Sequence, residues 1–275
     1  MASRTASVWD GREVVSLLVR RDLKVKYQSS FLGYAWSMLE PLAMAAIYWF
    51  VFGVLYGQRV GPDGGGTNGY VIFLLAGLLP WLTFNAGITD STRALTSQSK
   101  LITTMKVPRE VFPLGVVAGK VVEFFFSLPV LLLFAVIFRI WPSWEGLYWL
   151  PAALLTQTVL LAGLALLLSS ANVLLRDVQR IVRILTRLMF YAAPIIYPLS
   201  KVTDAAASGH VPVWLKNVYE ANPIVGIMQM FHAVWFPSEA PDTKLLLTSV
   251  IGSLVVFAFG WWLFRRLEPA ILKEL

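Results

Sequence analysis

Residues 20–42 read RRDLKVKYQSSFLGYAWSMLEPL, a short basic segment joined directly to an apolar run that begins at Ala35. A run of roughly 20 apolar residues can cross a bilayer as a helix. The cations just before this run are Arg12, Arg20, Arg21, Lys24 and Lys26. Lys and Arg beside a first span are enriched on the cytoplasmic side, so the junction predicts a cytoplasmic N-terminal end.

The composition is typical of an integral membrane protein. Hydrophobic residues make up 57% of the 275 residues and charged residues only 14%, whereas a typical globular domain has about 25% charged residues. Cysteine is absent and histidine occurs twice, so we expect no disulfide scaffold, no metal site and no cofactor in this chain. The net charge of +7 is interpreted as membrane topology, and no nucleic-acid partner is expected.

Six apolar blocks approach the length of a membrane span. We predict an all-α membrane protein with one domain over 1–275, divided into an interfacial helix (1–34), six spans (35–265) and a cytoplasmic tail (266–275). An even number of spans places both ends in the cytoplasm, and 17 of the 23 Lys and Arg residues then fall in cytoplasmic segments, as the positive-inside rule requires. The blocks are 35–56, 70–90, 111–138, 148–173, 184–199 and 245–264.

The fifth block is interrupted by Pro194 and Pro198, so we expect a short or kinked span. Residues 212–236 are rich in aromatic residues but are broken by Asn222-Pro223. This pattern predicts interfacial or re-entrant helices at the outer face.

The N-terminal segment has the pattern of an amphipathic helix. Val14, Leu18, Val25 and Leu32 recur at spacings of four and seven, with basic residues on either side. Such a helix can lie among lipid headgroups and bind an anionic group there. The alternative is a helix that only anchors the topology.

A second amphipathic segment, SQSKLITTMKVPR, covers residues 97–109. It is long enough for two or three helical turns and approaches its end at a proline, as a helix boundary does. Its apolar face suits docking against a cytoplasmic partner, which a solvated loop would not need. The candidate docking residues are Lys100, Leu101, Ile102, Met105, Lys106 and Pro108.

Ionisable residues occur inside the apolar blocks. Lys120 and Glu123 are three residues apart and therefore share a helix face. Insertion of each charge into a membrane costs roughly 2.5–3.5 kcal/mol, so such residues pair or face a polar cavity. We predict a structural ion pair, with contact to a charged substrate as the alternative. Glu40, before Pro41, is a similar candidate.

The chain contains 11 Trp, 9 Tyr and 17 Phe. Most are expected to form interfacial belts or core packing. Aromatic faces also pack on the C–H faces of sugar rings, so a subset in the outer halves of the spans could line a glycan path. That subset is Tyr48, Trp49, Phe52, Tyr56, Tyr70, Phe73, Tyr191, Tyr197, Trp214 and Tyr219.

No sequence motif indicates an active site. The chain lacks a GxxxxGK[ST] nucleotide loop and a GxSxG turn, so we predict a transport subunit rather than an enzyme. A membrane-embedded glycosyltransferase or ligase is the rival, and it would need a catalytic acid in an outer loop. The acids there show no paired arrangement: Asp63, Glu145, Asp204, Glu220, Glu239 and Asp242.

Several short motifs follow one another along nearly the whole chain. They are Arg21-Asp22-Leu23-Lys24 with Tyr27, Leu32-Gly33 with Trp36 and Pro41-Leu42, Tyr70 with Gly77-Leu78 and Trp81, Leu101-Ile102 before Val107-Pro108-Arg109, Asn172 with Arg176-Asp177-Val178, Pro194 with Tyr197-Pro198, and Asn222-Pro223 before Phe231. Their order resembles that of the ABC-2 type permeases that export polysaccharides and teichoic acids. Within that family, the chain is most similar to the actinobacterial permeases for lipid-linked galactan. One departure is Ser97-Gln98-Ser99, because the family usually carries an asparagine there.

The resemblance implies an assembly and a cargo. Permeases of this family lie in the bacterial inner membrane and form homodimers with two copies of a cytoplasmic ATPase, which binds ATP and Mg. Residues 97–107 would be the coupling helix that contacts this ATPase. The cargo would be a polyprenyl-diphosphate-linked polysaccharide, galactan or O-antigen-like, exported through a tunnel between the protomers. A drug or other hydrophobic small molecule is the alternative cargo.

The resemblance also implies roles for particular residues. The lipid would reach the tunnel between the first and fifth spans, with a lateral gate at Pro41, Pro194 and Pro198. The cations that would capture the headgroup or diphosphate are Arg20, Arg21, Lys24 and Lys26.

Overall fold

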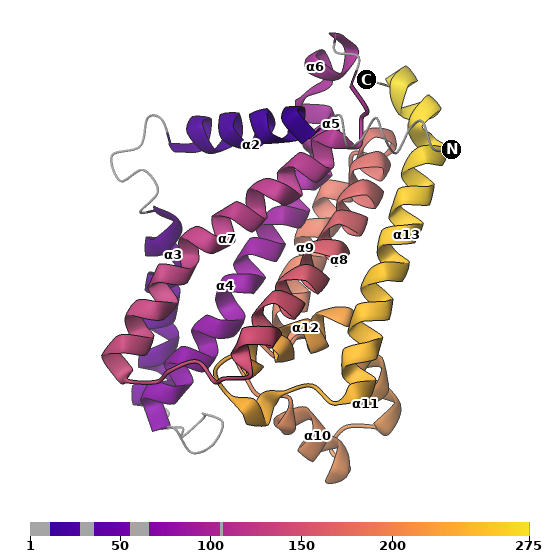
Figure 1. Ribbon diagram of the computed structural model, residues 1–275. Helices are drawn as coiled ribbons and strands as arrows, with labels where there is room; N and C mark the ends of the chain where they lie inside the picture. The colour runs from indigo at the N-terminus through magenta and orange to yellow at the C-terminus, as the bar shows by residue number, and fades with distance from the viewer. Residues whose placement is uncertain (1–11, 28–35, 56–65, 105–106, 275) are drawn as a thin grey trace.

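The structure is a computed structural model that describes residues 12–27, 36–55, 66–104 and 107–274. Within these ranges, the regular structure is helical throughout, and the long helices run side by side (Figure 1). The elements are α2 (Arg12–Tyr27), α3 (Trp36–Tyr48), the π-helix η2 (Trp49–Leu55), α4 (Gly66–Thr92), α5 (Ala94–Ser97), α6 (Ser99–Thr104), α7 (Val111–Phe138), α8 (Gly146–Leu174), α9 (Val178–Tyr191), α10 (Ser200–Ala207), α11 (Val213–Glu220), α12 (Pro223–Ala233), the 3₁₀-helix η4 (Pro237–Glu239) and α13 (Thr243–Glu274).

Among the described residues, 4 helices are long and apolar enough to cross a membrane. They are α4, α7, α8 and α13, which correspond to the second, third, fourth and sixth predicted blocks. The first block corresponds to α3 and η2, which are shorter.

The predicted boundaries of the fifth block, 184–199, are wrong. Helix α9 begins at Val178 and ends at Tyr191, and the chain that follows, up to Leu199, is not helical. This segment contains Pro194 and Pro198, and proline both lacks the backbone donor and obstructs the preceding helical turn. Arg180 and Arg183, which precede the predicted block, are therefore part of α9.

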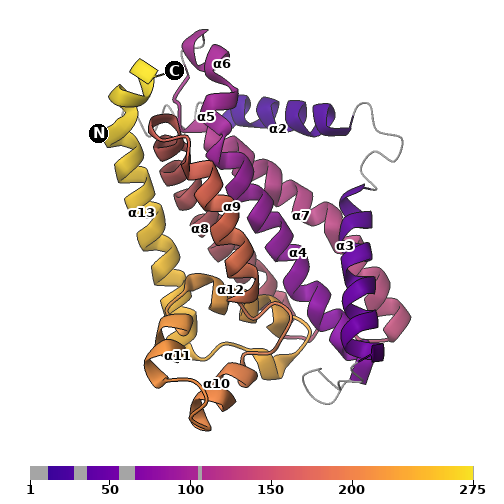
Figure 2. The same ribbon diagram turned by 180° about the vertical axis from the view of Figure 1, so that it is seen from behind.

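The two ends of the molecule differ. Helices α2, α5 and α6 and the C-terminal end of α13 gather at one end, and α10 and α11 lie at the other (Figures 1 and 2). Helix α2 lies across the direction of the long helices (Figure 1). The orientation predicted from the cations would place the α2 end in the cytoplasm.

Helix α4 is at the centre of the core, where residues 70–81 are all buried. Helix α12 packs against α4, α8 and α13. Asn222 caps α12 by accepting a hydrogen bond from the Ile224 amide at 3.1 Å, with proline at the next position. The fully buried His232 stacks on Phe73, with ring centroids 3.9 Å apart. Burial lowers the pKa of His232 because it disfavours the charged ring, so this histidine is neutral.

Small residues bring α8 and α13 into close contact. A Cβ atom on Gly163 would lie 2.5 Å from the Phe257 Cα, and one on Gly260 would overlap the Gly163 carbonyl oxygen. Glycines at such crossings allow helix backbones in membranes to approach closely. This contact fixes α13 against the bundle.

Candidate functional site

A cleft of about 430 Å³ lies between α3, α4 and α9. Figure 2 shows α9 and α3 on either side of α4. The volume is within the range of small-molecule sites. We call this space the arginine cleft, and its lining residues are Met44, Trp81, Leu82, Asn85, Thr89, Arg183, Thr186, Arg187, Phe190 and Tyr191.

Helical periodicity explains which residues face the arginine cleft. On α4, Trp81, Asn85 and Thr89 are spaced by four residues and therefore share one face. Arg183 and Arg187 have the same spacing on α9, which runs antiparallel to α4 (Figure 2). The cleft is thus cationic toward the α2 end and aromatic toward the α10 end.

Ring contacts establish the aromatic end of the cleft. The centroids of Trp81 and Phe190 are 6.1 Å apart, and those of Phe190 and Tyr191 are 5.1 Å apart. Trp81 and Phe190 are buried, whereas Tyr191 is 62% exposed. Tyr191 is therefore the member of this group that is available to a ligand.

Neither cleft arginine has a carboxylate partner among the residues that the structure describes. Arg183 Nε donates to the Gln179 carbonyl of its own helix at 3.3 Å. A smaller cavity of about 90 Å³ shares Thr89 and Arg183 with the cleft and continues to Thr92 and Gln179. The arginine end of the cleft is thus polar, and its two positive charges have no carboxylate partner among the described residues.

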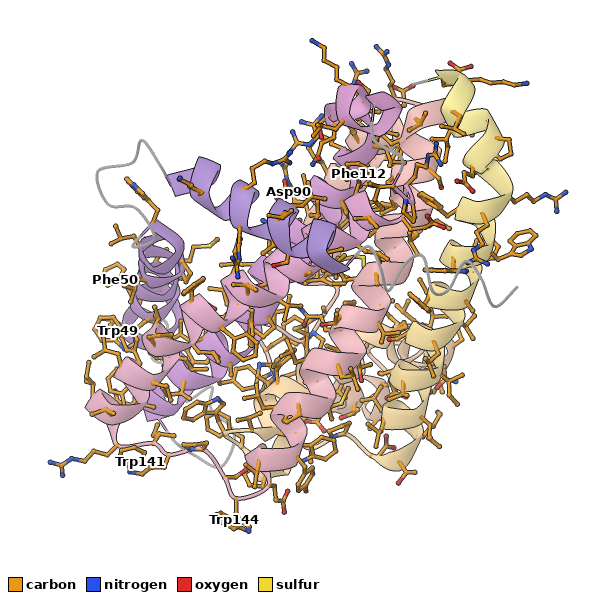
Figure 3. The ribbon with its side chains drawn as sticks, turned by 45° about the horizontal axis from the view of Figure 1, so that its top comes forward. Trp49, Phe50, Asp90, Phe112, Trp141 and Trp144 are labelled. Atoms are coloured by element: carbon orange, nitrogen blue, oxygen red, sulfur yellow. The ribbon has the colours of Figure 1, made fainter. Side chains whose placement is uncertain are left out.

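A second cavity, of about 310 Å³, lies under α2 and contains a different arrangement of charges. Lys120 Nζ lies 2.9 Å from Asp90 Oδ2 and 3.1 Å from Glu123 Oε2. Arg93 also contacts Asp90, at 3.2 Å. Figure 3 shows Asp90 beside α2. These four residues, which we call the paired cluster, contain two cations and two carboxylates.

The cations of α2 lie on its exposed surface. Arg20, Arg21 and Lys24 are exposed, whereas the Lys26 side chain lies outside the described part of the chain. On the opposite side, Leu18 is buried and its Cδ1 lies 3.6 Å from the position that a Cβ on Gly115 would occupy. Helix α2 is therefore amphipathic, with its apolar side on α7.

In the predicted docking segment, residues 97–109, α5 ends at Ser97 and α6 covers Ser99–Thr104, so the helix does not reach Pro108. Lys100 is exposed and Pro108 is half-buried. Met105 and Lys106 lie outside the described residues. Docking to an ATPase through this segment stays a prediction.

Ile102 has a different environment from its neighbours in that segment. It is only 2% exposed and belongs to a buried cluster with Leu95, Phe112 and Phe264, against which Leu101 also packs. The sequence predicts that Ile102 lies on a surface that contacts a partner, whereas its side chain is in a buried cluster with residues of α7 and α13. It can position the segment without touching a partner.

Two of the predicted glycan-path aromatics are core residues. Tyr70 is 1% exposed and its hydroxyl donates to the Ile196 carbonyl at 3.2 Å, and Phe73 is fully buried against His232. These side chains pack the interior of this chain and do not line the arginine cleft.

The other predicted aromatics differ in exposure. Trp214 is exposed, and Trp49 lies on the outside of the helix bundle (Figure 3). The hydroxyls of Tyr197 and Tyr219 are 3.3 Å apart, and Tyr197 donates to the Tyr191 carbonyl at 2.9 Å. Burial, with this contact, raises the pKa of Tyr219, so its phenol is neutral. The side chains of Tyr48 and Phe52, and all of Tyr56, lie outside the described part of the chain.

The predicted gate prolines are buried. Pro41 lies inside α3, and Pro194 and Pro198 lie in the non-helical segment after α9. Pro41 therefore lies within one helix of the cleft, and Pro194 and Pro198 follow another. The Glu40 side chain is not among those described.

Two of the outer acids have structural partners. Glu220 lies 3.3 Å from Lys216, and the buried Glu239 accepts a hydrogen bond from Gln229 at 3.2 Å. These contacts account for both carboxylates without a catalytic role.

Arg183 and Arg187 are the site residues that sequence reasoning missed. The positive-inside rule predicts both among the 17 cations of the cytoplasmic segments, but the spacing of the arginines predicts a helix. Arg176, Arg180, Arg183 and Arg187 follow one another at spacings of four, three and four, which is the pattern of a single helix face.

The long apolar helices and the charged cleft among them define a multi-pass membrane protein with the features of a transporter. The chain matches the ABC-2 type transporter family over residues 13–236. It is 31% identical to the O-antigen export system permease protein RfbA of Myxococcus xanthus, over 89% of this chain and 88% of that protein. The RfbA protein of Klebsiella pneumoniae is 29% identical, over 93% and 92% of the two chains. The polysialic acid transport protein KpsM of Escherichia coli is 24% identical, over 94% and 95%.

The chain therefore belongs to the ABC-2 type transporter family. It is the membrane subunit of a transporter, located in the bacterial inner membrane, and not an enzyme.

Proposed function

We propose that this chain is the permease of an ATP-driven exporter that moves a polyprenyl-diphosphate-linked polysaccharide, galactan or O-antigen-like, to the outer side of the inner membrane. The observation that carries the proposal is the 31% identity to an O-antigen export permease over 89% of this chain. The sequence has no nucleotide-binding loop, so a separate ATPase supplies the energy.

The proposed assembly is a homodimer with two copies of that ATPase. Docking involves Lys100, Leu101, Met105 and Lys106. Because Ile102 anchors α6 to α7 and α13, a push on this segment is transmitted to two spanning helices. This packing supports the segment as the coupling element.

The exposed cations of α2, together with Lys26, are proposed to make the first contact with the lipid headgroup. Helix α2, which carries the exposed Arg20, Arg21 and Lys24, lies at the same end of the molecule as α5 (Figure 1), where a helix in the headgroup plane meets anionic groups. The lipid then passes between α3 and α9, near Pro41, Pro194 and Pro198, and the exposed aromatics contact the glycan.

Depletion of this chain, followed by fractionation of lipid-linked glycans, tests the function. We expect full-length glycan to accumulate on the cytoplasmic leaflet, because synthesis continues while export stops. Glycans truncated at one sugar would instead indicate a glycosyltransferase. Unchanged glycans would favour the alternative cargo, a hydrophobic small molecule.

Met105→Glu tests docking by placing a charge on the proposed contact. We expect the ATPase to be lost on co-purification. Val213→Glu is the matched control, because Val213 is exposed on α11 at the opposite end of the molecule (Figure 1). Equal co-purification of both variants would remove Met105 from the docking surface.

A further inference from the structure

We propose that Arg183 and Arg187 bind the phosphate or diphosphate group of an amphipathic anion that reaches the arginine cleft from the membrane. This inference rests on the proposed function and deepens it. It assigns to the cargo lipid a binding site separate from the exposed cations of α2.

The first argument is depth. Arg187 lies nine residues after the first residue of α9, which is about 14 Å along a helix at 1.5 Å per residue. A cation at membrane depth is unfavourable unless it is paired or faces a polar cavity, and such residues mark substrate pathways. Both arginines are exposed and line the arginine cleft.

The second argument is the missing counter-charge. Arg180, on the same helix, is 3.6 Å from Asp177, and both side chains are exposed. Within the described parts of the chain, no carboxylate lies within ion-pair distance of Arg183 or Arg187. Among the described residues, the cleft lining contains Asn85 and two threonines but no acid. An anionic ligand would supply the charge that the lining lacks.

The third argument is the type and spacing of the cations. Residues four apart on a helix have Cβ atoms about 5–6 Å apart, so two guanidinium groups can converge on one ligand. Arginine presents a planar fork of donors that matches phosphate oxygens in pairs. A diphosphate offers acceptors for both forks, and the Asn85 amide can add a neutral donor.

The fourth argument is the aromatic end of the same cleft. Trp81, Phe190 and Tyr191 form its wall away from the arginines. The exposed Tyr191, which packs on the buried Phe190, can contact the apolar part of a ligand or the C–H face of a sugar. One charged end and one aromatic end in a single cleft fit an amphipathic molecule better than free phosphate.

The test uses the complete permease–ATPase complex in phosphatidylcholine nanodiscs, with radiolabelled geranylgeranyl diphosphate as the probe. The double variant Arg183→Gln/Arg187→Gln should raise the Kd by about 100-fold, because two charge-assisted contacts are lost. Arg183→Lys/Arg187→Lys keeps the charge but loses the forks and should raise the Kd by about tenfold.

Arg180→Gln is the matched control and should leave the Kd unchanged, because Arg180 does not line the cleft. Each variant must elute with its ATPase as the wild type does, which shows that it is folded. An unchanged Kd in the folded double variant would overturn the proposal.

Competitors distinguish the sources of the phosphate. Inorganic pyrophosphate should displace the probe only weakly, because it lacks the apolar part, and phosphatidylglycerol should displace it poorly. Displacement by phosphatidylglycerol at the same concentration as unlabelled probe would identify a general lipid-headgroup site and overturn the cargo assignment.

Normal glycan export with an unchanged Kd in the double variant would contradict this inference alone. Normal glycan localisation after depletion would contradict the proposed function.

Discussion

The paired cluster and the arginine cleft lie on different faces of α4 and differ in how their charges are balanced. Asp90 faces Lys120 of α7, whereas the adjacent Thr89 faces Arg183 of α9. The paired cluster has two cations and two carboxylates in contact, whereas the described lining of the cleft has two cations and no acid. The buried Lys120 needs a compensating partner, because burying a charge is unfavourable, whereas Arg183 and Arg187 are exposed at the cleft. We infer that the paired cluster holds α4 and α7 together, whereas the arginine cleft binds a ligand.

Charge reversal in the arginine cleft should have the largest effect. We expect Arg187→Glu to reduce export of the lipid-linked glycan at least 100-fold, because the cleft would repel a diphosphate. The measurement is the rate at which labelled glycan appears on the outer surface of cells. The Arg180→Glu variant should export glycan at the normal rate. An equal loss of export in both variants would mean that the total charge of α9, and not the cleft, determines export.

Removal of the shared cation should instead destabilise the paired cluster. Lys120→Leu leaves Asp90 and Glu123 without their common partner and should lower the free energy of unfolding by about 2 kcal/mol, less than for a fully buried pair because Asp90 is 40% exposed. Thermal unfolding in detergent measures the loss. Arg187→Leu is the comparison and should not lower the unfolding temperature. A triple variant that adds Asp90→Asn and Glu123→Gln should recover most of the loss.

Addition of an acid should make the cleft resemble the paired cluster. Asn85→Asp places a carboxylate in the lining with Arg183 and Arg187. We expect the Kd for geranylgeranyl diphosphate to rise about tenfold, because the new anion competes for the guanidinium groups. Unfolding temperature should stay the same or rise. A lower Kd would show that the arginines do not contact the diphosphate.

The smallest effect is expected for loss of one acid from the paired cluster. Asp90→Asn leaves Lys120 with Glu123 at 3.1 Å, and Asp90 is partly screened by solvent. The free energy of unfolding should fall by less than about 1 kcal/mol, as measured by thermal unfolding. A loss as large as that of Lys120→Leu would mean that Glu123 does not compensate the lysine.

Much of the fold was predictable because long apolar blocks determine spanning helices. The blocks at 111–138 and 148–173 match α7 and α8 closely, and the break at Asn222-Pro223 separates α11 from α12. These features depend on local sequence, namely the length of an apolar run and the position of a proline.

The arginine cleft was not predictable in the same way. The positive-inside rule favours cytoplasmic loops for arginines, so it predicts that the fifth span begins at residue 184, whereas α9 begins at Val178. The rule does not account for a helix whose arginines face a cavity. Periodicity could have placed Arg183 and Arg187 on one face, but the neighbouring faces of α3 and α4 come from tertiary packing.

Tertiary packing also decides the roles of single side chains. Asp90 joins Lys120 across 30 positions of sequence, which no local pattern reveals. Tyr70 and Phe73 are aromatic residues like the exposed Tyr191, yet they are buried in the core. Burial is set by neighbours from other helices, and residue type alone does not determine it.

A cysteine-protection measurement tests the central claim most directly. The chain has no cysteine, so Asn85→Cys puts one thiol in the arginine cleft and Gly119→Cys puts one in the cavity of the paired cluster. We predict that geranylgeranyl diphosphate slows labelling of Cys at position 85 by a water-soluble thiosulfonate about tenfold, with no effect at position 119. This protection should disappear when Arg183 and Arg187 are both changed to glutamine. Equal protection at both positions, or protection that survives the loss of both arginines, would contradict the account.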